Sequence, residues 1–343
     1  MTSKIEEENN YKKGDMVEYD GVKCPIEAAE KKWYRVYNMT GIIALVNGIK
    51  NKGALEKLII ANNALLTKEV TKEVGKIFGD LLKSNTTLTE LDVSNMRTRR
   101  GSDGPVFAQG LADGLKNNRA LTSLNISSNN IGELIAPTGW TRGSYNKGSG
   151  KYEWSHSDGR TEEAKKPSGS KPVGIIALGD AIQNNGTLQK LRIDNNCISG
   201  AEAGKALGNA LKANSVLKEL DLSNQKQYGL PGMNTFDSGF AKEFIIGLRT
   251  NRALENLHIG ANSIPVDKMK EIIDLCADKP TMQVLCEVPF KDKAITELDI
   301  SGKNLGIEGA MVVNDYLKNN KALTGLNIAN NQLLTAEAGK ILA

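Results

Sequence analysis

The chain of 343 residues has an ordinary composition for a globular protein, with 40% hydrophobic residues, 24% charged residues and a formal net charge of +4. A net charge this small argues against a nucleic-acid-binding protein, because phosphate contacts require clustered lysine and arginine side chains. No window approaches the roughly 18 apolar residues that span a bilayer, and the first residues lack the apolar core of a secretion signal. We therefore expect an intracellular, cytoplasmic protein without a membrane span.

Residues 1–40 predict a β-rich segment that follows a polar, disordered start. Asp20 and Gly21 lie between two β-prone runs, and this dipeptide favours a tight hairpin turn. Residues 33–37 predict a further strand. We expect the segment to be a cap, because the first unit of a repeat protein exposes an apolar edge that must be covered.

From residue 41 the chain alternates between two patterns. Residues 41–49 and 67–82 carry apolar side chains at the spacing of one helix face. Between them, the residues from Leu55 to Leu65 fit the pattern LxxLxLxxNxL, which needs a short strand with one buried side and an asparagine at a sharp bend. The strand pattern can be placed at eight positions along the chain, starting at residues 55, 88, 121, 188, 217, 254, 295 and 323.

Some units depart from this pattern. The unit at 295 opens with isoleucine, and three units lack the asparagine at the bend, where they have Met96, Gln225 and Lys303. We expect these three bends to differ locally, because the carboxamide that would bond neighbouring backbone groups is missing. The asparagines one residue away are expected to substitute for it: Asn95, Asn224 and Asn304.

The repeated pattern resembles that of leucine-rich repeat proteins of the ribonuclease-inhibitor-like subclass. The resemblance covers residues 41–131 and 173–343. It implies an α/β solenoid shaped as a curved horseshoe, with parallel strands on the concave face and helices on the convex face. Small β-hairpin excursions are expected to leave this framework.

The array reads as one continuous solenoid with a duplicated block. The run that begins at Gly41 recurs from Gly174, so a first block at 41–131 corresponds to a second block at 173–264. Residues 265–343 add the last two units after a linking stretch that reaches residue 294. The sequence stops within the last predicted helix, which we expect to be truncated.

Residues 132–172 separate the two blocks and contain aromatic side chains spaced by glycines, including Trp140 and Trp154. This composition predicts a small β-hairpin excursion from the solenoid. Three interpretations stay open for it: a packed structural excursion, a partner-binding loop and a peptide-reading module.

No catalytic, cofactor-binding or metal-binding pattern is found. The two histidines, His156 and His258, belong to no HExxH pair, and the sequence has no phosphate-binding loop and no nucleophile elbow. Four cysteines lie far apart without a CxxC pair, which indicates reduced thiols, and Cys197 is expected in the repeat core. We expect neither enzymatic activity nor a bound cofactor.

The candidate site is the concave strand face, whose outward positions flank the buried leucines. At these positions acids outnumber bases: Glu56, Glu90, Asp92, Asp194, Glu219, Asp221, Glu255, Glu297 and Asp299 against Lys57, Lys190, Arg192 and Lys218. Three units repeat Glu-Leu-Asp, which would suit lysine or arginine from a basic protein partner. An ordinary solvated polar face is the equally weighted alternative. The candidate partner-binding residues are Glu90, Asp92, Arg192, Glu219, Asp221, His258, Glu297 and Asp299, with Trp140 and Trp154 in the insertion.

These features favour a non-enzymatic scaffold that binds a protein partner. A second hypothesis is a GTPase activator similar to the leucine-rich repeat activators of Ran, for which Arg97, Arg99 and Arg100 after the second strand are the residues to consider. A third is a structural subunit of a large assembly. The sequence leaves the three open.

Overall fold

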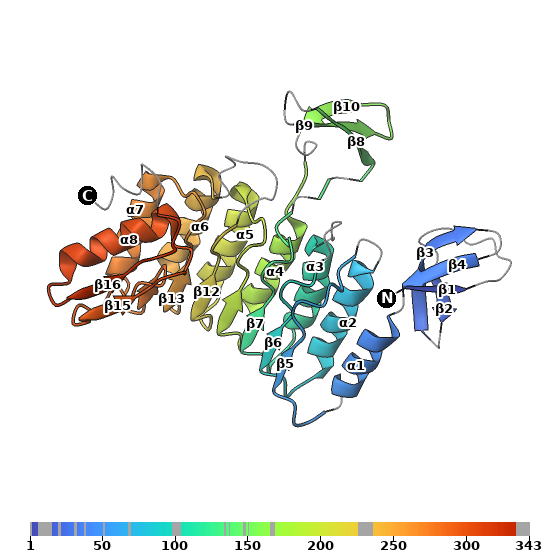
Figure 1. Ribbon diagram of the computed structural model, residues 1–343, viewed down its shortest axis with the longest axis horizontal. Helices are drawn as coiled ribbons and strands as arrows, with labels where there is room; N and C mark the ends of the chain where they lie inside the picture. The colour runs from blue at the N-terminus through green and yellow to red at the C-terminus, as the bar shows by residue number, and fades with distance from the viewer. Residues whose placement is uncertain are drawn as a thin grey trace.

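The computed structural model describes residues 2–5, 16–19, 22–30, 33–37, 39–50, 52–67, 70–97, 104–133, 135–136, 138–146, 149, 151–164, 169–225 and 236–333. Within these ranges the chain forms eight helices and sixteen strands (Figure 1). From residue 40 onward, helices and short strands alternate, apart from one insertion and from β14 and β15, which follow one another without a helix between them. The strands lie along one side of the molecule and the helices along the other.

The main sheet has seven parallel strands in chain order, and the central leucines of neighbouring strands pair directly, as Leu58 with Leu91 and Leu91 with Leu124. Six of its strands lie where the repeat pattern predicts them. The seventh, β14, lies in the stretch that the sequence predicts to be a link. The strands are β5 (Lys57–Ile59), β6 (Glu90–Asp92), β7 (Ser123–Asn125), β11 (Lys190–Arg192), β12 (Glu219–Asp221), β13 (Asn256–His258) and β14 (Val284–Leu285).

The last two predicted strands are present, but they form a separate parallel pair. β15 (Glu297–Asp299) pairs with β16 (Gly325–Asn327), and among the described residues neither joins the main sheet. The sheet is therefore interrupted between β14 and β15, where one uninterrupted array was expected. Residues 334–343, which hold the predicted truncated helix, lie outside the described residues.

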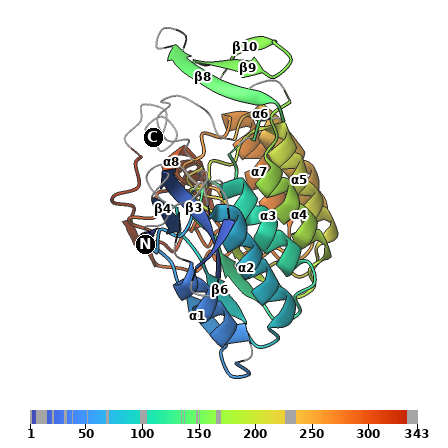
Figure 2. The ribbon, with the colours of Figure 1, turned by 90° about the vertical axis from the view of Figure 1, so that its right-hand side faces the viewer.

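The helices run side by side, and some of them touch through glycine (Figures 1 and 2). A Cβ atom added to Gly79 would lie 2.2 Å from the carbonyl oxygen of Gly110, and one added to Gly247 would lie 1.9 Å from that of Gly208. Only glycine leaves room for helices to approach this closely. The helices are α1 (Thr40–Lys50), α2 (Thr71–Ser84), α3 (Gly104–Leu115), α4 (Val173–Asn184), α5 (Gly200–Ala213), α6 (Ser238–Thr250), α7 (Val266–Asp278) and α8 (Gly306–Asn319).

The core lies between the strands and the helices and is continuous along the array. The central leucines of the strands, such as Leu124 and Leu191, are fully buried. Phe78 and Phe107 meet edge to face between α2 and α3, with ring centroids 6.3 Å apart. Burial of each large apolar side chain contributes about 1.5–3 kcal/mol, so stability is spread over the repeats.

A ladder of buried side chains joins the loops in which each helix ends and the next strand begins. Asn118 is typical: its Nδ2 donates to the carbonyl oxygens of Leu82 (2.7 Å) and Asn85 (3.2 Å), while its Oδ1 accepts the Leu121 N–H (2.7 Å). The sequence analysis missed this feature, although an asparagine three residues before the first leucine of a unit recurs. The helix-end ladder consists of Asn85, Asn118, Asn185, Asn214, Asn251 and Lys279.

A second ladder, the turn ladder, is built from the bend asparagines of the repeat pattern. Asn196 is fully buried; its Oδ1 accepts the Asn129 N–H (2.7 Å) and its Nδ2 donates to the Ile126 carbonyl (3.0 Å), both in the preceding unit. Each bend residue therefore fastens two units together. The other carboxamides that bond in this way are Asn129, Gln225, Asn262 and Asn331.

The units without asparagine differ from expectation. Gln225 takes the position itself, because its Oε1 accepts the Asn196 N–H (2.9 Å) and its Nε2 donates to the Ile193 carbonyl (2.7 Å). Met96 fills the same place as a buried apolar side chain. The neighbouring asparagines do not substitute; they adopt the left-handed backbone conformation that asparagine tolerates, with positive φ at Asn95 (49°), Asn224 (55°) and Asn304 (57°).

Cys197 also differs from expectation. It is only half-buried, with φ of +60°, and its Sγ donates to Asn130 Oδ1 (3.6 Å). It therefore lies at the bend and not in the core. Cys276 and Cys286 are buried free thiols, and burial is the main reason why the pKa of Cys276 rises to about 12.

The N-terminal segment forms a four-stranded antiparallel sheet with the order β1-β4-β3-β2. The predicted hairpin is confirmed, since Tyr19 pairs with Val22, although the turn residues 20–21 lie outside the described residues. Residues 2–5 form a strand, and residues 6–10, where the disordered start was expected, lie outside the described residues. The strands are β1 (Thr2–Ile5), β2 (Met16–Tyr19), β3 (Val22–Glu30) and β4 (Trp33–Tyr37).

The insertion leaves the array between β7 and α4 and is larger than the predicted hairpin. It forms a three-stranded antiparallel sheet of β8 (Trp140–Asn146), β9 (Lys151–His156) and β10 (Thr161–Ala164) that projects beyond the ends of the helices (Figures 1 and 2). At its base, Ile135 and Lys171 exchange two backbone hydrogen bonds of 2.9 and 3.0 Å. Because the ends of the insertion meet there, β7 and β11 still pair as neighbours.

Candidate functional site

The outward side chains of the strands form two rows across the main sheet. They flank the central leucine of each strand, and we name this surface the strand face. Strand register places each side chain beside its counterpart in the next unit. The first row is Lys57, Glu90, Ser123, Lys190, Glu219 and Asn256, and the second is Ile59, Asp92, Asn125, Arg192, Asp221 and His258.

All four bases that the sequence places on this face have acidic partners in the following unit. The pairs are half-exposed or exposed, so each contributes less than about 1 kcal/mol. They pair all four bases with acids of the strand face, so the acidic excess that the sequence indicates comes from the acids outside these pairs, such as Glu297 and Asp299. The pairs are Lys57–Glu90 (2.8 Å), Lys190–Glu219 (3.0 Å), Lys218–Glu255 (2.9 Å) and Arg192–Asp221 (3.5 Å).

Arg192 lies at the centre of the second row and contacts two carboxylates. Its Nη2 is 3.5 Å from Asp194 Oδ1 and its Nε is 3.5 Å from Asp221 Oδ2. Burial raises the pKa of Asp194, and the charge of Asp221 adds to this, while the Ser127 hydroxyl that donates to Asp194 opposes it. Arg192 therefore holds together two acids that would otherwise repel each other.

His258 ends the second row and pairs with Glu287, which lies just after β14. Its Nδ1 is 2.9 Å from Glu287 Oε1. Burial favours the neutral imidazole, but Glu287, Asp221 and Glu219 together outweigh burial and raise the pKa of His258. The hydrogen bond from His258 correspondingly lowers the pKa of Glu287. The sequence analysis missed Glu287, although the spacing of Met282 and Leu285 could have indicated one more strand.

Glu297 and Asp299 lie on the separate strand pair and differ from the acids of the main sheet. Both are exposed, and in the described part of the chain neither forms an ion pair. Asp299 accepts hydrogen bonds from Ser301 Oγ (2.7 Å) and Asn327 Nδ2 (3.1 Å), and the bonds from Ser301 are the main cause of its lowered pKa. Asp299 therefore stays charged and available to solvent.

The two insertion tryptophans have different environments, and the strands that carry them, β8 and β9, lie away from the strand face (Figure 1). Trp154 is buried, 5% exposed, and its Nε1–H donates to the Ala164 carbonyl (3.1 Å). Trp140 is half-buried; its ring lies 5.3 Å from that of His156 and 5.8 Å from the Arg160 guanidinium. Trp154 therefore stabilises the small sheet, whereas Trp140 is part of a surface cluster.

The arginines considered for a GTPase activator cannot be grouped into a site. Arg97 donates from Nη1 to Asn130 Oδ1 at 3.3 Å, which holds it against the next unit. Arg99 and Arg100 lie outside the described residues.

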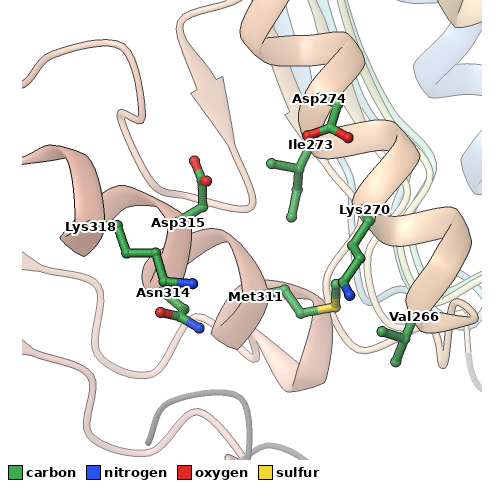
Figure 3. Close-up of a pocket in the computed structure, with 8 residues that line it drawn as sticks. All are labelled: Val266, Lys270, Ile273, Asp274, Met311, Asn314, Asp315 and Lys318. Carbon is green, nitrogen blue, oxygen red and sulfur yellow. The ribbon is translucent and has the colours of Figure 1, made fainter.

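A hollow of about 340 Å³ opens between α7 and α8, on the helix side of the molecule (Figure 3). Its apolar lining comes from Val266, Ile273 and Met311, and its polar lining includes Lys270 and Asp315. Both signs of charge line it, so it shows no preference for an anion or a cation.

Within the described ranges, no helix is long and apolar enough to cross a membrane. The same ranges contain no group of three or more histidine, cysteine, aspartate or glutamate residues that could hold a metal ion.

No family model and no curated protein matches the chain. Among solved structures, the tropomodulin C-terminal domain of Caenorhabditis elegans is 11% identical with a TM-score of 0.33, covering 70% of this chain and 91% of that one. The structure of Leiomodin-1 Actin-Binding Site 2 is 16% identical with a TM-score of 0.29, covering 43% and 71%. An internalin from Listeria monocytogenes is 13% identical with a TM-score of 0.20, covering 84% and 95%. At these TM-scores the description of the fold rests on the repeats and the strand pairing above.

Proposed function

We propose that the chain is a non-enzymatic, cytoplasmic scaffold of the ribonuclease-inhibitor-like repeat type, and that it binds a basic segment of a protein partner on its strand face. Solenoids offer extended surfaces whose side chains are held at fixed spacings by the strands. On this surface two rows of mostly polar and charged side chains run from unit to unit, and the horseshoe curvature implied by the repeat type would make it concave.

The observation that carries the proposal is that some acids of the strands already pair with a lysine or arginine of this chain, whereas others do not. Glu219 and Asp221 of β12 already face Lys190 and Arg192. Glu297 and Asp299 of β15 are exposed and lack such partners among the described residues. A lysine or arginine from a partner need not displace an internal cation there, so we assign the anchor of the docking site to β15.

The Trp140 cluster is the second element of this proposal. A half-buried indole beside the imidazole of His156 and under the guanidinium of Arg160 offers a flat apolar surface with a polar rim. Such surfaces are enriched at protein interfaces. We propose that it adds apolar contact area while β15 provides the charge.

The proposal is tested by fluorescence anisotropy with a labelled oligolysine peptide as the probe. The double variant Glu297→Gln/Asp299→Asn is expected to bind about tenfold more weakly, because two carboxylates are removed from the anchor. The matched control is Asp180→Asn/Glu202→Gln, which removes the same charge from exposed helix positions. Equal affinity of the two double variants would contradict a docking site at β15.

A further inference from the structure

Every helix that precedes a strand of the array ends at the same edge, because the strands are parallel and all begin there. The helix-end ladder shows that these loops touch in series. Asn118 Nδ2 donates to the Asn85 carbonyl (3.2 Å), Asn185 Nδ2 to the Asn118 carbonyl (3.1 Å) and Asn214 Nδ2 to the Asn185 carbonyl (2.9 Å). Side chains that flank the ladder residues therefore lie in a line along this edge, one loop after another.

The flanking positions carry a repeated positive charge. The residue two positions before the ladder residue is Lys83, Lys116, Lys212 and Arg249 in four units, and Lys318 precedes Asn320 in the same way. The residue directly after it is basic in three units, with Arg119, Arg252 and Lys321. Acids also lie near these cations: Asp278 and Asp292 in the loops, and Asp113 and Asp315 near the helix ends, where they act on Lys83 and Lys293. We name these cations, with Lys291 and Lys293, the basic edge.

The cations crowd most closely around Lys279, which replaces asparagine in the ladder. Its buried ammonium donates to the carbonyl oxygens of Asn251 (2.6 Å) and Arg249 (3.3 Å). Burial lowers the pKa of Lys279, and the charge of Arg252 lowers it further. Burial also lowers the pKa of Lys293; the charge of Asp315 opposes this, and the charge of Lys291 adds to it by a smaller amount. Cations are thus held beside one another here.

The simpler explanation of the repeated positive charge is that it complements the helix dipoles, since cations at helix C-termini stabilise the helix. It accounts for residues in the last turn, such as Lys116 and Lys212. It also accounts for Arg119, whose Nη1 donates to the carbonyl oxygens of Lys116 (3.4 Å) and Asn118 (3.2 Å) at the end of α3. It does not account for Arg252 and Lys321, which follow Asn251 and Asn320 beyond the ends of α6 and α8. Internal pairing is limited as well: Lys83 contacts Asp113, and Arg249 lies 2.9 Å from Glu271.

We propose that the basic edge is a second interaction surface, distinct from the strand face, and that it binds an extended acidic polypeptide segment. Glutamate and aspartate side chains on such a segment reach the exposed cations one at a time from loop to loop. The geometry suits this occupant because the cations lie in a line and not in a compact cluster.

The burial of the aromatic rings favours a polypeptide over single-stranded nucleic acid. Bases bind such proteins by stacking on exposed aromatic rings. The rings at this edge, Phe290 and Tyr316, are buried and faced by the ammonium groups of Lys291 (5.8 Å) and Lys293 (4.9 Å).

A membrane surface is also less suited. Of the exposed large apolar side chains among the described residues, Leu317 on the last turn of α8 lies at this edge. Ile246 and Leu45 lie within their helices, away from it. One leucine inserts little apolar area, so binding would depend on charge alone.

The test uses the full chain and a fluorescein-labelled oligoglutamate peptide. The edge variant Arg119→Gln/Arg252→Gln/Lys321→Gln is expected to bind about tenfold more weakly than the unaltered chain, and wild-type binding is expected to weaken as salt rises. The control variant Lys76→Gln/Lys205→Gln/Lys242→Gln removes the same charge from exposed helix positions and should change the affinity by less than about twofold. Arg252→Lys keeps the charge and should bind normally.

Thermal unfolding followed by circular dichroism confirms that each variant is folded, since all the substituted side chains are exposed. Equal loss of binding in the edge and control variants would overturn the proposal, because net charge alone would then explain it. Edge-dependent binding of oligothymidylate or of phosphatidylserine vesicles that exceeds binding of the peptide would also overturn it, in favour of a nucleic acid or a membrane.

Discussion

The same tripeptide, Glu-Leu-Asp, occupies β12 and β15 and has two different environments. In β12 the acids are half-buried beside Lys190 and Arg192, and Leu220 is 1% exposed. In β15 the acids are exposed, and Leu298 is 9% exposed. The local sequence is identical, so the difference comes from the neighbouring strands. β12 lies between two strands of the main sheet, whereas β15 pairs with β16 alone.

The interruption between these regions has a local cause. After β14, Cys286 and Glu287 both have positive φ, at 48° and 65°, and Leu285 and Val288 exchange backbone hydrogen bonds of 3.0 Å. This is the geometry of a tight hairpin turn. It turns the chain back and uses the backbone groups that the next parallel strand would need.

Glu308 of α8 bridges the interruption on the turn ladder. Its Oε1 accepts the Ile264 N–H at 2.7 Å, the position at which Asn196 and Gln225 accept in the central units. The side chain is 1% exposed. The central units are therefore fastened by neutral carboxamides, whereas the C-terminal region is fastened by an ionisable carboxyl group.

The largest expected effect is on the free energy of unfolding, and it differs between the central leucines of β12 and β15. Leu220→Ala should lower the free energy of unfolding by about 3–4 kcal/mol, because a fully enclosed side chain leaves a cavity. Leu298→Ala should cost about 2 kcal/mol, because the pair β15–β16 can close over the lost volume or hydrate it. Urea unfolding followed by circular dichroism measures both. If Leu298→Ala is as costly as Leu220→Ala, the C-terminal pair is packed as firmly as the main sheet.

A smaller effect on stability is expected at Glu308 in the turn ladder. Burial raises the pKa of Glu308 above its ordinary 4.5, so its contribution to stability is full at low pH and is lost as pH rises through the raised pKa. Glu308→Gln should remove this pH dependence and keep the bond to Ile264, as Gln225 does in its own unit. Glu308→Ala should cost about 1–3 kcal/mol at low pH, since it leaves a buried N–H without a partner, and less as pH rises through the raised pKa.

Unfolding measured from acidic to neutral pH compares the three chains. A slope that persists in Glu308→Gln would assign the pH dependence to another group. Equal stability of the Gln and Ala variants would show that the hydrogen bond to Ile264 does not hold the C-terminal region.

The repeat spacing was sufficient to predict the eight strands, because the burial of leucines such as Leu58 and Leu191 depends only on period. It was not sufficient for the ion pairs, since Lys190 meets Glu219 only when the strands are in register. The strand β14 was not predicted, because two positions of its unit are atypical. Met282 stands where leucine is typical, and Cys286 stands where a polar residue is typical. The three-stranded insertion could not be derived either, because glycine-spaced aromatics do not determine the number of strands.

The smallest expected effect concerns the pair at the end of the main sheet. His258 has a raised pKa, so its contribution to stability is present below its ordinary value of 6.5 and is lost as pH rises through the raised value. Glu287→Gln removes the nearest carboxylate and should lower the pKa of His258, with a loss of ~1 kcal/mol or less below that value. The pKa is followed by NMR through the imidazole proton shifts. Glu255→Gln is the control, because it removes a carboxylate that pairs with Lys218. If both variants leave the pKa of His258 unchanged, Asp221 and Glu219 on the neighbouring strand are the groups that raise it.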